Sequence, residues 1–169
     1  VRLTAAAGES WDGFVRDAVA RDLAGVECLA GIPGLVGATP IQNVGAYGQE
    51  VSDTIESVRV LDRRTNEVHT VAREACGFAY RHSAFKERPE DTIVLDVTFA
   101  LTPGGAPSLR YGELTKAFAA AESAPTLASV REKVIALRRG KSMVVDPADE
   151  NRHSAGSFFT NPIVTAEEA

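Results

Sequence analysis

The sequence is poor in the residues that build disulfide frameworks, metal sites and membrane spans. Only two of its 169 residues are cysteine, and neither Cys28 nor Cys76 has a second cysteine or a histidine at metal-ligand spacing. No apolar run approaches the roughly 18 to 20 residues that cross a bilayer. We therefore expect two reduced cysteines in the core, no metal site and no membrane insertion.

A surplus of positive charge is also missing. The chain carries 18 basic and 23 acidic residues, which gives a net charge of −5 and a pI near 5.2. Nucleic acids and anionic membrane surfaces attract proteins through a positive field, so we expect neither as a partner. The opening residues VRLTAAAGES lack the basic and apolar regions of a signal peptide, and we expect a cytoplasmic protein.

The pattern of apolar residues predicts an α+β fold. Strands are predicted at residues 1–8, in the two arms of a hairpin within 57–72, and at 92–101. Helices are predicted at residues 10–25, 112–122 and 129–140. The strands and helices follow one another in mixed order without regular βαβ alternation, and this order is typical of the α+β class.

The ends of two helices carry signals of their own. Ser10 is the predicted N-cap of the first helix and Gly25 its C-cap, and the apolar face between them extends to Leu23. Ser129 and Glu132 have the spacing of a capping box, which predicts that the last helix begins there. Gly140 is its predicted end.

The segment GIPGLVGATPIQNVGAYGQE, residues 31–50, has five glycines and two prolines but almost no charge. Glycine lets backbone N–H groups approach an anion or a flat ring closely, and the amides of Gln42 and Asn43 and the ring of Tyr47 could add contacts. A tight crossover that uses glycine only for turns is equally compatible with the spacing. The Gly-x-Gly-x-x-Gly and P-loop patterns of common nucleotide sites are absent.

Two further stretches carry polar chemistry. AYRHSAFK, residues 79–86, contains Arg81, whose planar guanidinium suits a carboxylate or phosphate, although composition alone favours a solvated basic turn. His82 has no evident carboxylate partner near it in sequence, and we expect an exposed or satisfied imidazole. SAGSFFTNP, residues 154–162, places Ser157 beside aromatic residues; alone, this pattern favours a turn serine, because no Ser-His-Asp arrangement or Gly-x-Ser-x-Gly motif accompanies it.

In this order, the three stretches resemble the MurB family, the UDP-N-acetylenolpyruvoylglucosamine reductases. The glycine-rich segment is similar to the family's IPG-x-VGA-x-P-x-QN-x-GAYG-x-E motif at every fixed position. YRHSAFK resembles YR-x-S-x-FK, and AGSFFTNP resembles GSFF-x-NP. LRRGK and the Asp-Pro pair at 146–147 also occur where relatives have them. The resemblance covers nearly the whole chain and favours the functional interpretations over the turn-only ones.

The resemblance implies part of a two-lobed FAD-binding domain of the vanillyl-alcohol-oxidase/PCMH type. Residues 1–140 would be its second lobe, and residues 141–169 a linker and the start of a substrate-binding domain. The implied enzyme is an NADPH-dependent flavoenzyme of peptidoglycan synthesis that reduces UDP-N-acetylglucosamine enolpyruvate to UDP-N-acetylmuramate. Its cofactors are FAD and NADPH, and its partner is the UDP-sugar enolpyruvyl ether. A hydride passes from the flavin to C3, and C2 is protonated.

The motif positions that match imply a role for individual residues. Ser157 takes the role of proton donor to C2, and Arg81 that of the active-site arginine against the substrate carboxylate. Tyr80, Lys141 and Asn161 are implied substrate contacts, together with Arg81 and Ser157. The implied FAD contacts are Ile32, Pro33, Gly34, Gly37, Ala38, Thr39, Asn43, Gly45, Ala46 and Tyr47.

Two parts of the family pattern have no counterpart in the sequence. They are an N-terminal lobe with a Gly-Ser-Asn loop for the flavin pyrophosphate, and most of a C-terminal domain with an active-site glutamate. We therefore expect the central part of a longer, monomeric enzyme, inactive by itself and weak in FAD binding. One alternative is a non-catalytic fragment that self-associates through uncovered apolar surface. The other is a different FAD oxidoreductase of the same superfamily.

Overall fold

The structure is a computed structural model that describes residues 1–121, 123–151 and 159–167, and its central feature is an antiparallel sheet. The four strands lie in the order β1-β7-β5-β6. They are β1 (Arg2–Ala6), β5 (Ile55–Asp62), β6 (Val68–Ala72) and β7 (Thr92–Ala100). Two short antiparallel pairs join β2 (Leu23–Ala24) to β8 (Thr102–Pro103) and β3 (Gly45–Ala46) to β4 (Gln49–Glu50).

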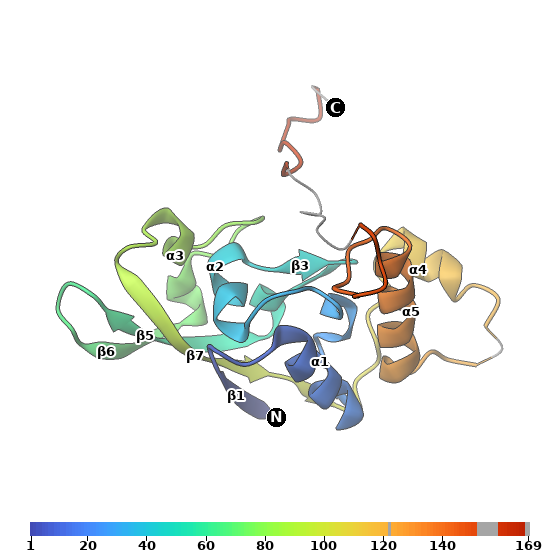
Figure 1. The fold of residues 1–169 in the computed structure, drawn as a ribbon, viewed down its shortest axis with the longest axis horizontal. Helices are drawn as coiled ribbons and strands as arrows, with labels where there is room; N and C mark the ends of the chain where they lie inside the picture. Colours follow the sequence, from blue (N-terminus) through green and yellow to red (C-terminus); the bar gives the residue numbers. More distant parts are fainter. Residues whose placement is uncertain (122, 152–158, 168–169) are drawn as a thin grey trace.

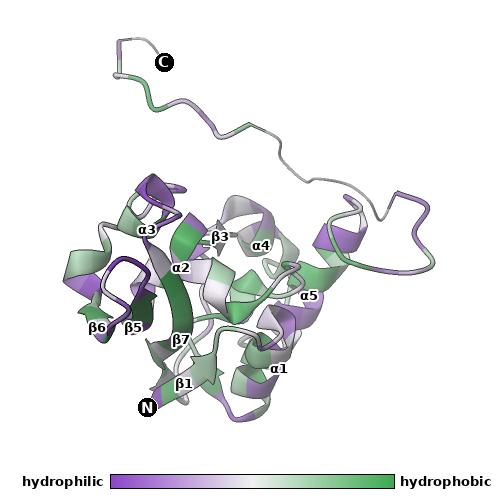
Figure 2. Ribbon diagram, turned by 60° about the vertical axis from the view of Figure 1, so that its left-hand side comes forward, coloured by the Kyte–Doolittle hydropathy of each residue, from purple (hydrophilic) through white to green (hydrophobic). Residues whose placement is uncertain are grey.

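The helices gather mostly at one end of this sheet. Helices α1 (Trp11–Ala20) and α5 (Leu127–Arg139) stand side by side there, and the β5–β6 hairpin projects at the other end (Figure 1). The short helices are α2 (Thr39–Gln42), α3 (Ala84–Glu87) and α4 (Gly112–Ala117). Single 3₁₀ turns cover residues 27–29, 36–38, 51–53 and 73–76. Figure 2 shows the central strand β7 as largely hydrophobic and α3 as mostly hydrophilic.

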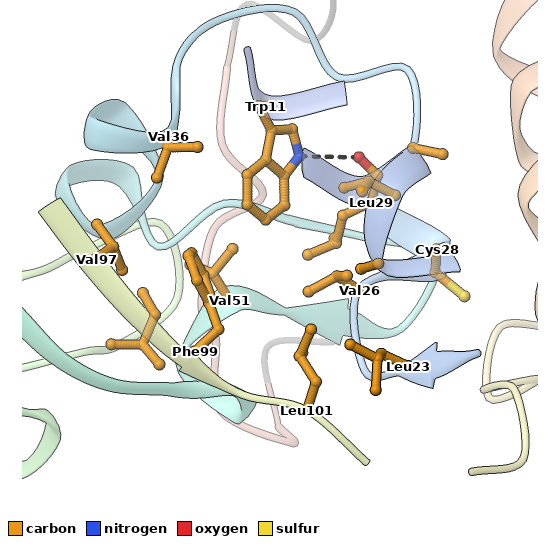
Figure 3. Close-up of a cluster of buried hydrophobic side chains, with 14 of the residues drawn as sticks. Trp11, Leu23, Val26, Cys28, Leu29, Val36, Val51, Val97, Phe99 and Leu101 are labelled. Carbon is orange, nitrogen blue, oxygen red and sulfur yellow. Dashed lines mark hydrogen bonds between the residues drawn. The ribbon is translucent and has the colours of Figure 1, made fainter. Parts of the chain in front are cut away.

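The core is centred on Trp11, which is 1% exposed. Its indole N–H donates to the carbonyl of Leu29 at 3.0 Å, and its ring lies 5.6 Å from that of Phe14 and 5.8 Å from that of Phe99. Valines from the 3₁₀ turns and from β7 complete the cluster (Figure 3). Helix α1 is thereby fixed against the sheet by aromatic packing.

A buried polar group holds the β3–β4 pair in place. Glu27 is fully buried and accepts hydrogen bonds from the Gly25 and Ser108 amides and from Nε2 of Gln49, each at 2.8 Å. The Gln49 side chain in turn accepts from the amide of Cys28 at 2.8 Å. Because a buried carboxylate needs such donors, this network fixes strand β4 relative to the core.

The predicted strands are confirmed, and so is the start of the first helix. Ser10 is the N-cap of α1, and its Oγ accepts from the amide of Gly13 at 3.2 Å. The predicted end at Gly25 is wrong, because α1 ends at Ala20, Asp22 turns the chain with a φ of 56°, and Leu23 belongs to β2. Asp tolerates this left-handed conformation.

The two later helices also differ from prediction at their ends. Helix α4 ends at Ala117, five residues before the predicted limit. Helix α5 begins at Leu127, because Thr126 is the N-cap and forms the capping box with Ser129. The predicted pairing of Ser129 with Glu132 is therefore wrong, whereas Gly140 does end the helix.

Both cysteines are free and buried, as predicted. Burial raises the pKa of the Cys28 thiol to about 12 and that of Cys76 to about 11, so both remain protonated at neutral pH. We expect iodoacetamide at pH 8 to leave the folded chain unmodified and to alkylate both thiols after denaturation, as read by intact mass. Alkylation of either thiol in the native state at the rate of a free thiol would contradict this expectation.

Within the described residues, no helix is both long and apolar enough to cross a bilayer. The same residues contain no group of three or more His, Cys, Asp or Glu side chains placed to hold a metal ion.

Candidate functional site

A cleft of about 790 Å³ brings together residues that are far apart in the sequence. Its lining comes from the β3–β4 turn, the turn at residues 80–81, residues 110–111, the end of α5 with the residues after it, and residues 159–161. Seven of the predicted site residues line it: Gly45, Ala46, Tyr47, Tyr80, Arg81, Lys141 and Asn161.

Arg81 occupies a strained backbone position in this cleft. It lies in a four-residue turn closed by hydrogen bonds from Ala79 N to His82 O at 3.1 Å and from His82 N to Ala79 O at 3.0 Å. Its φ of 54° is one that such a turn usually reserves for glycine. A bulky residue held there costs of order 1 kcal/mol, and strain of this kind is found preferentially at functional sites.

The Arg81 guanidinium is held by backbone carbonyls. Nη2 donates to the carbonyl of Gly45 at 2.5 Å, and Nη1 donates to that of Asn43 at 3.4 Å. A Cβ on Gly45 would lie 2.8 Å from Nη1, so this position must be glycine for the guanidinium to lie where it does. The guanidinium also sits 5.4 Å from the ring centroid of Tyr80.

Arg138 and Lys141 form a second cationic group. Arg138 is 9% exposed and donates from Nη2 to the carbonyl of Met143 at 2.8 Å, while its Nε is buried without a hydrogen-bond partner among the described residues. Burial lowers the pKa of Arg138. A buried donor that lines a cleft and lacks a protein partner is suited to an anionic ligand.

Lys141 is held between Glu113 and the ring of Tyr47. Its Nζ donates to Glu113 at 2.8 Å, which raises the pKa of Lys141, and it lies 5.8 Å from the centroid of the Tyr47 ring. Tyr47 meets Tyr111 edge-to-face at 5.5 Å, and burial raises the Tyr47 pKa. With Arg110, the cleft lining therefore contains four basic side chains against the acidic Glu50 and Asp53.

The predicted FAD contacts outside the cleft fall into two sets. Ile32, Pro33, Gly34 and Ala38 are exposed or half-buried, and an added Cβ on Gly34 would meet open space. Gly37 is buried instead, and its amide donates to Ala7 O at 2.9 Å, where a Cβ would come within 2.6 Å of Ala7 Cβ. This glycine is explained by packing against the end of β1.

The side chains of Thr39 and Asn43 are occupied by protein partners. Thr39 Oγ1 donates to Val36 O at 2.8 Å. Asn43 is 1% exposed, and Nδ2 donates to Glu50 and to Ala79 O, each at 2.9 Å. Contact of these residues with FAD stays a prediction, and Ser157 lies outside the described residues.

Sequence reasoning missed part of the site. Arg110, Tyr111 and Arg138 line the cleft, although only Lys141 was singled out from LRRGK. The repeated arginines were a signal, but the burial of Arg138 near the end of α5 depends on tertiary contacts, among them Gly31, on which a Cβ would lie 3.5 Å from the Arg138 Nε. The imidazole of His82 is satisfied, which is one of the two states expected for it, but the sequence did not reveal its partner: helix α3 brings Glu87 to 3.2 Å from its Nε2.

Comparison with known proteins identifies relatives along the whole chain. The family described as "FAD binding domain" matches residues 1–72. UDP-N-acetylenolpyruvoylglucosamine reductase of Saccharopolyspora erythraea is 54% identical over 99% of this chain and 46% of its own length. The proteins of the same name from Streptomyces coelicolor and Mycobacterium tuberculosis are 54% and 53% identical, over 98% and 96% of this chain and 44% and 46% of their own lengths.

The fold has a solved counterpart as well. The crystal structure of MurB from Thermus caldophilus superposes with a TM-score of 0.66 at 26% identity, covering 95% of this chain and 48% of that one. The chain thus spans about half the length of the relatives that it matches. Its mixed helices and strands form an α+β FAD-binding fold. The chain belongs to the MurB family of UDP-N-acetylenolpyruvoylglucosamine reductases.

Proposed function

We propose that this chain is the central part of an enzyme that reduces UDP-N-acetylglucosamine enolpyruvate to UDP-N-acetylmuramate for peptidoglycan, with FAD and NADPH as cofactors. The observation that carries the proposal is the presence in one cleft of Arg81 and of the separate cationic group of Arg138 and Lys141. The substrate bears two anionic parts, an enolpyruvyl carboxylate and a diphosphate, and each cationic group suits one of them.

Among the described residues, the segment 32–35 fits a flavin. Residues 32–35 present partly exposed, uncharged backbone and apolar side chains, with open space beside Gly34, as a flat ring laid along the chain requires. The half-buried residues of β3 line the cleft itself. When bound, FAD supplies hydride transfer, which protein side chains do not provide.

Arg81 supplies electrostatic stabilisation in the proposed reaction. The carbonyls of Asn43 and Gly45 fix the guanidinium in advance, so it needs no reorganisation when negative charge builds on the substrate carboxylate during reduction. Lys141 and Arg138 hold the diphosphate, and Tyr80 and Asn161 complete the contacts. Ser157 is proposed to give the proton to C2, helped by a nearby cation because a hydroxyl is a weak acid.

The experiment follows the two half-reactions separately in the full-length protein. Lys141→Met is expected to raise the KM for the enolpyruvyl substrate about tenfold to a hundredfold, the effect of one lost charge-assisted hydrogen bond. Reduction of FAD by NADPH should not change. Lys116→Met, an exposed lysine of α4, is the matched control and should leave both half-reactions unaltered.

A second variant tests Ser157, and two further outcomes separate the alternative functions. Ser157→Ala should leave FAD reduction intact and slow substrate reduction, and a normal rate of substrate reduction would remove Ser157 from its proposed role. Reduction of FAD by NADPH without any reaction of the UDP-sugar would indicate another flavin oxidoreductase. Absence of flavin from the full-length protein would favour the non-catalytic alternative.

A further inference from the structure

Asn43 connects three segments around the cleft through a buried side chain. It ends helix α2 with a φ of 45°, and its Oδ1 accepts from the amide of Ser52 at 3.2 Å. Both hydrogens of Nδ2 are used, one on Glu50 and one on the carbonyl of Ala79. The amide therefore ties the end of α2 to the 3₁₀ turn at 51–53 and to the first residue of the turn that contains Arg81.

The contacts of Asn43 and Arg81 close a ring. The Asn43 side chain holds the turn at Ala79, and two residues later the Arg81 guanidinium returns to the main-chain carbonyls of Asn43 and Gly45. Ser83 adds a parallel tie, because its Oγ donates to Ile41 O at 2.7 Å. The left-handed backbone of Asn43 and the positive φ of Arg81 are thus stabilised by the same set of hydrogen bonds.

We propose that Asn43 is a positioning residue for Arg81: its buried amide fixes the carbonyl pair and the turn that hold the guanidinium in the cleft. With 1% exposure and both side-chain donors engaged inside the protein, Asn43 acts on the reaction through Arg81. This inference rests on the proposed function only for its effect on turnover. The position of Arg81 can be tested without it.

The first test measures the accessibility of the Arg81 guanidinium in the 169-residue chain. Phenylglyoxal modifies accessible guanidinium groups, and mass spectrometry gives the rate at Arg81. Asn43→Gly keeps the left-handed backbone but removes the amide, and we expect Arg81 modification about fivefold to tenfold faster, as loss of a buried hydrogen bond predicts. Asn66→Gly is the matched control, because Asn66 also has a positive φ of 59° but lies in the β5–β6 turn.

The second test uses the full-length protein. Asn43→Gly should lower kcat for the enolpyruvyl substrate about tenfold to a hundredfold, as expected for a displaced catalytic group, with FAD affinity unchanged. Loss of FAD affinity with unchanged Arg81 reactivity would make Asn43 a cofactor ligand and overturn the proposal. Faster Arg81 modification in a protein that lacks the activity would support the positioning and refute the proposed function instead.

A second variant covers the case in which Asn43→Gly does not fold. Asn43→Asp keeps the shape of the side chain and the oxygen that accepts from Ser52, but it loses both donors. Hydrogen exchange of the Ala79 and His82 amides, which close the turn, should then become faster in this variant than in the parent chain. Unchanged exchange and unchanged Arg81 reactivity in a folded Asn43 variant would overturn the proposal.

Discussion

Arg81→Gly in the full-length protein is expected to lower kcat/KM for the enolpyruvyl substrate by about 10²- to 10³-fold, the usual effect of removing a preorganised charge stabiliser. The same change should make the folded chain more stable than Arg81→Ala by about 1 kcal/mol, because glycine adopts the φ of 54° freely and alanine does not. Urea unfolding of the two variants gives this difference. Function and backbone strain are thereby measured at one position.

Asp22 provides the control for this pair of variants. It is exposed, has a φ of 56° and lies after α1, outside the cleft lining. Asp22→Gly should likewise be more stable than Asp22→Ala, but neither should change turnover. An Arg81→Ala chain more stable than Arg81→Gly would show that the turn relaxes to another conformation, and unchanged turnover in both would remove Arg81 from the reaction.

Trp11→Ala is expected to lower the free energy of unfolding by about 3 to 5 kcal/mol, the range for large aromatic truncations in packed cores. The indole is 1% exposed and packs on Phe14 and Phe99, so its loss leaves a cavity and also removes the donor to Leu29 O. Urea unfolding followed by circular dichroism is the suitable measurement, because Trp11 is the one tryptophan and a fluorescence signal would be lost with it.

Trp11→Phe separates the two contributions. It keeps an aromatic ring but loses the indole N–H, so we expect a smaller loss, about 1 to 3 kcal/mol, from the unsatisfied Leu29 carbonyl and the reduced volume. A change below 1 kcal/mol for Trp11→Ala would mean that α1 does not depend on this cluster for its docking.

The sequence predicted elements well where the signal is local. Alternation indicated β1, two runs of strand-forming residues around a polar turn indicated the β5–β6 hairpin, and Val and Ile indicated β7. The hydroxyl of Ser10 indicated the start of α1. The ends of the helices were harder to predict, because several neighbouring residues could each serve as the cap. Thr126 takes the N-cap position from Ser129, and the packing of Leu23 in β2 ends the helical pattern early.

The candidate site was predictable only as a set of segments. Along the chain the glycines of residues 31–50 look alike, but in the fold they serve different ends. Gly37 allows the approach of Ala7, Gly45 leaves room for the Arg81 guanidinium, and Gly34 faces open space. The partners of Gly37 and Gly45 lie 30 and 36 residues away in the sequence, and Arg138 lies against Gly31, more than a hundred residues before it, so no local pattern contains these differences.

The pairing of β1 with β7 has a consequence for how the molecule forms during synthesis. Arg2 lies opposite Ala100, and the aromatic cluster of α1 includes Phe99, so the earliest segments of this chain find their partners only after about a hundred residues have been made. The β5–β6 hairpin, whose strands are neighbours in sequence, can form long before. On a ribosome the chain would therefore carry the part of α1 that packs on Phe99, the rings of Trp11 and Phe14, uncovered until β7 emerges, and that interval is when it most needs protection from aggregation.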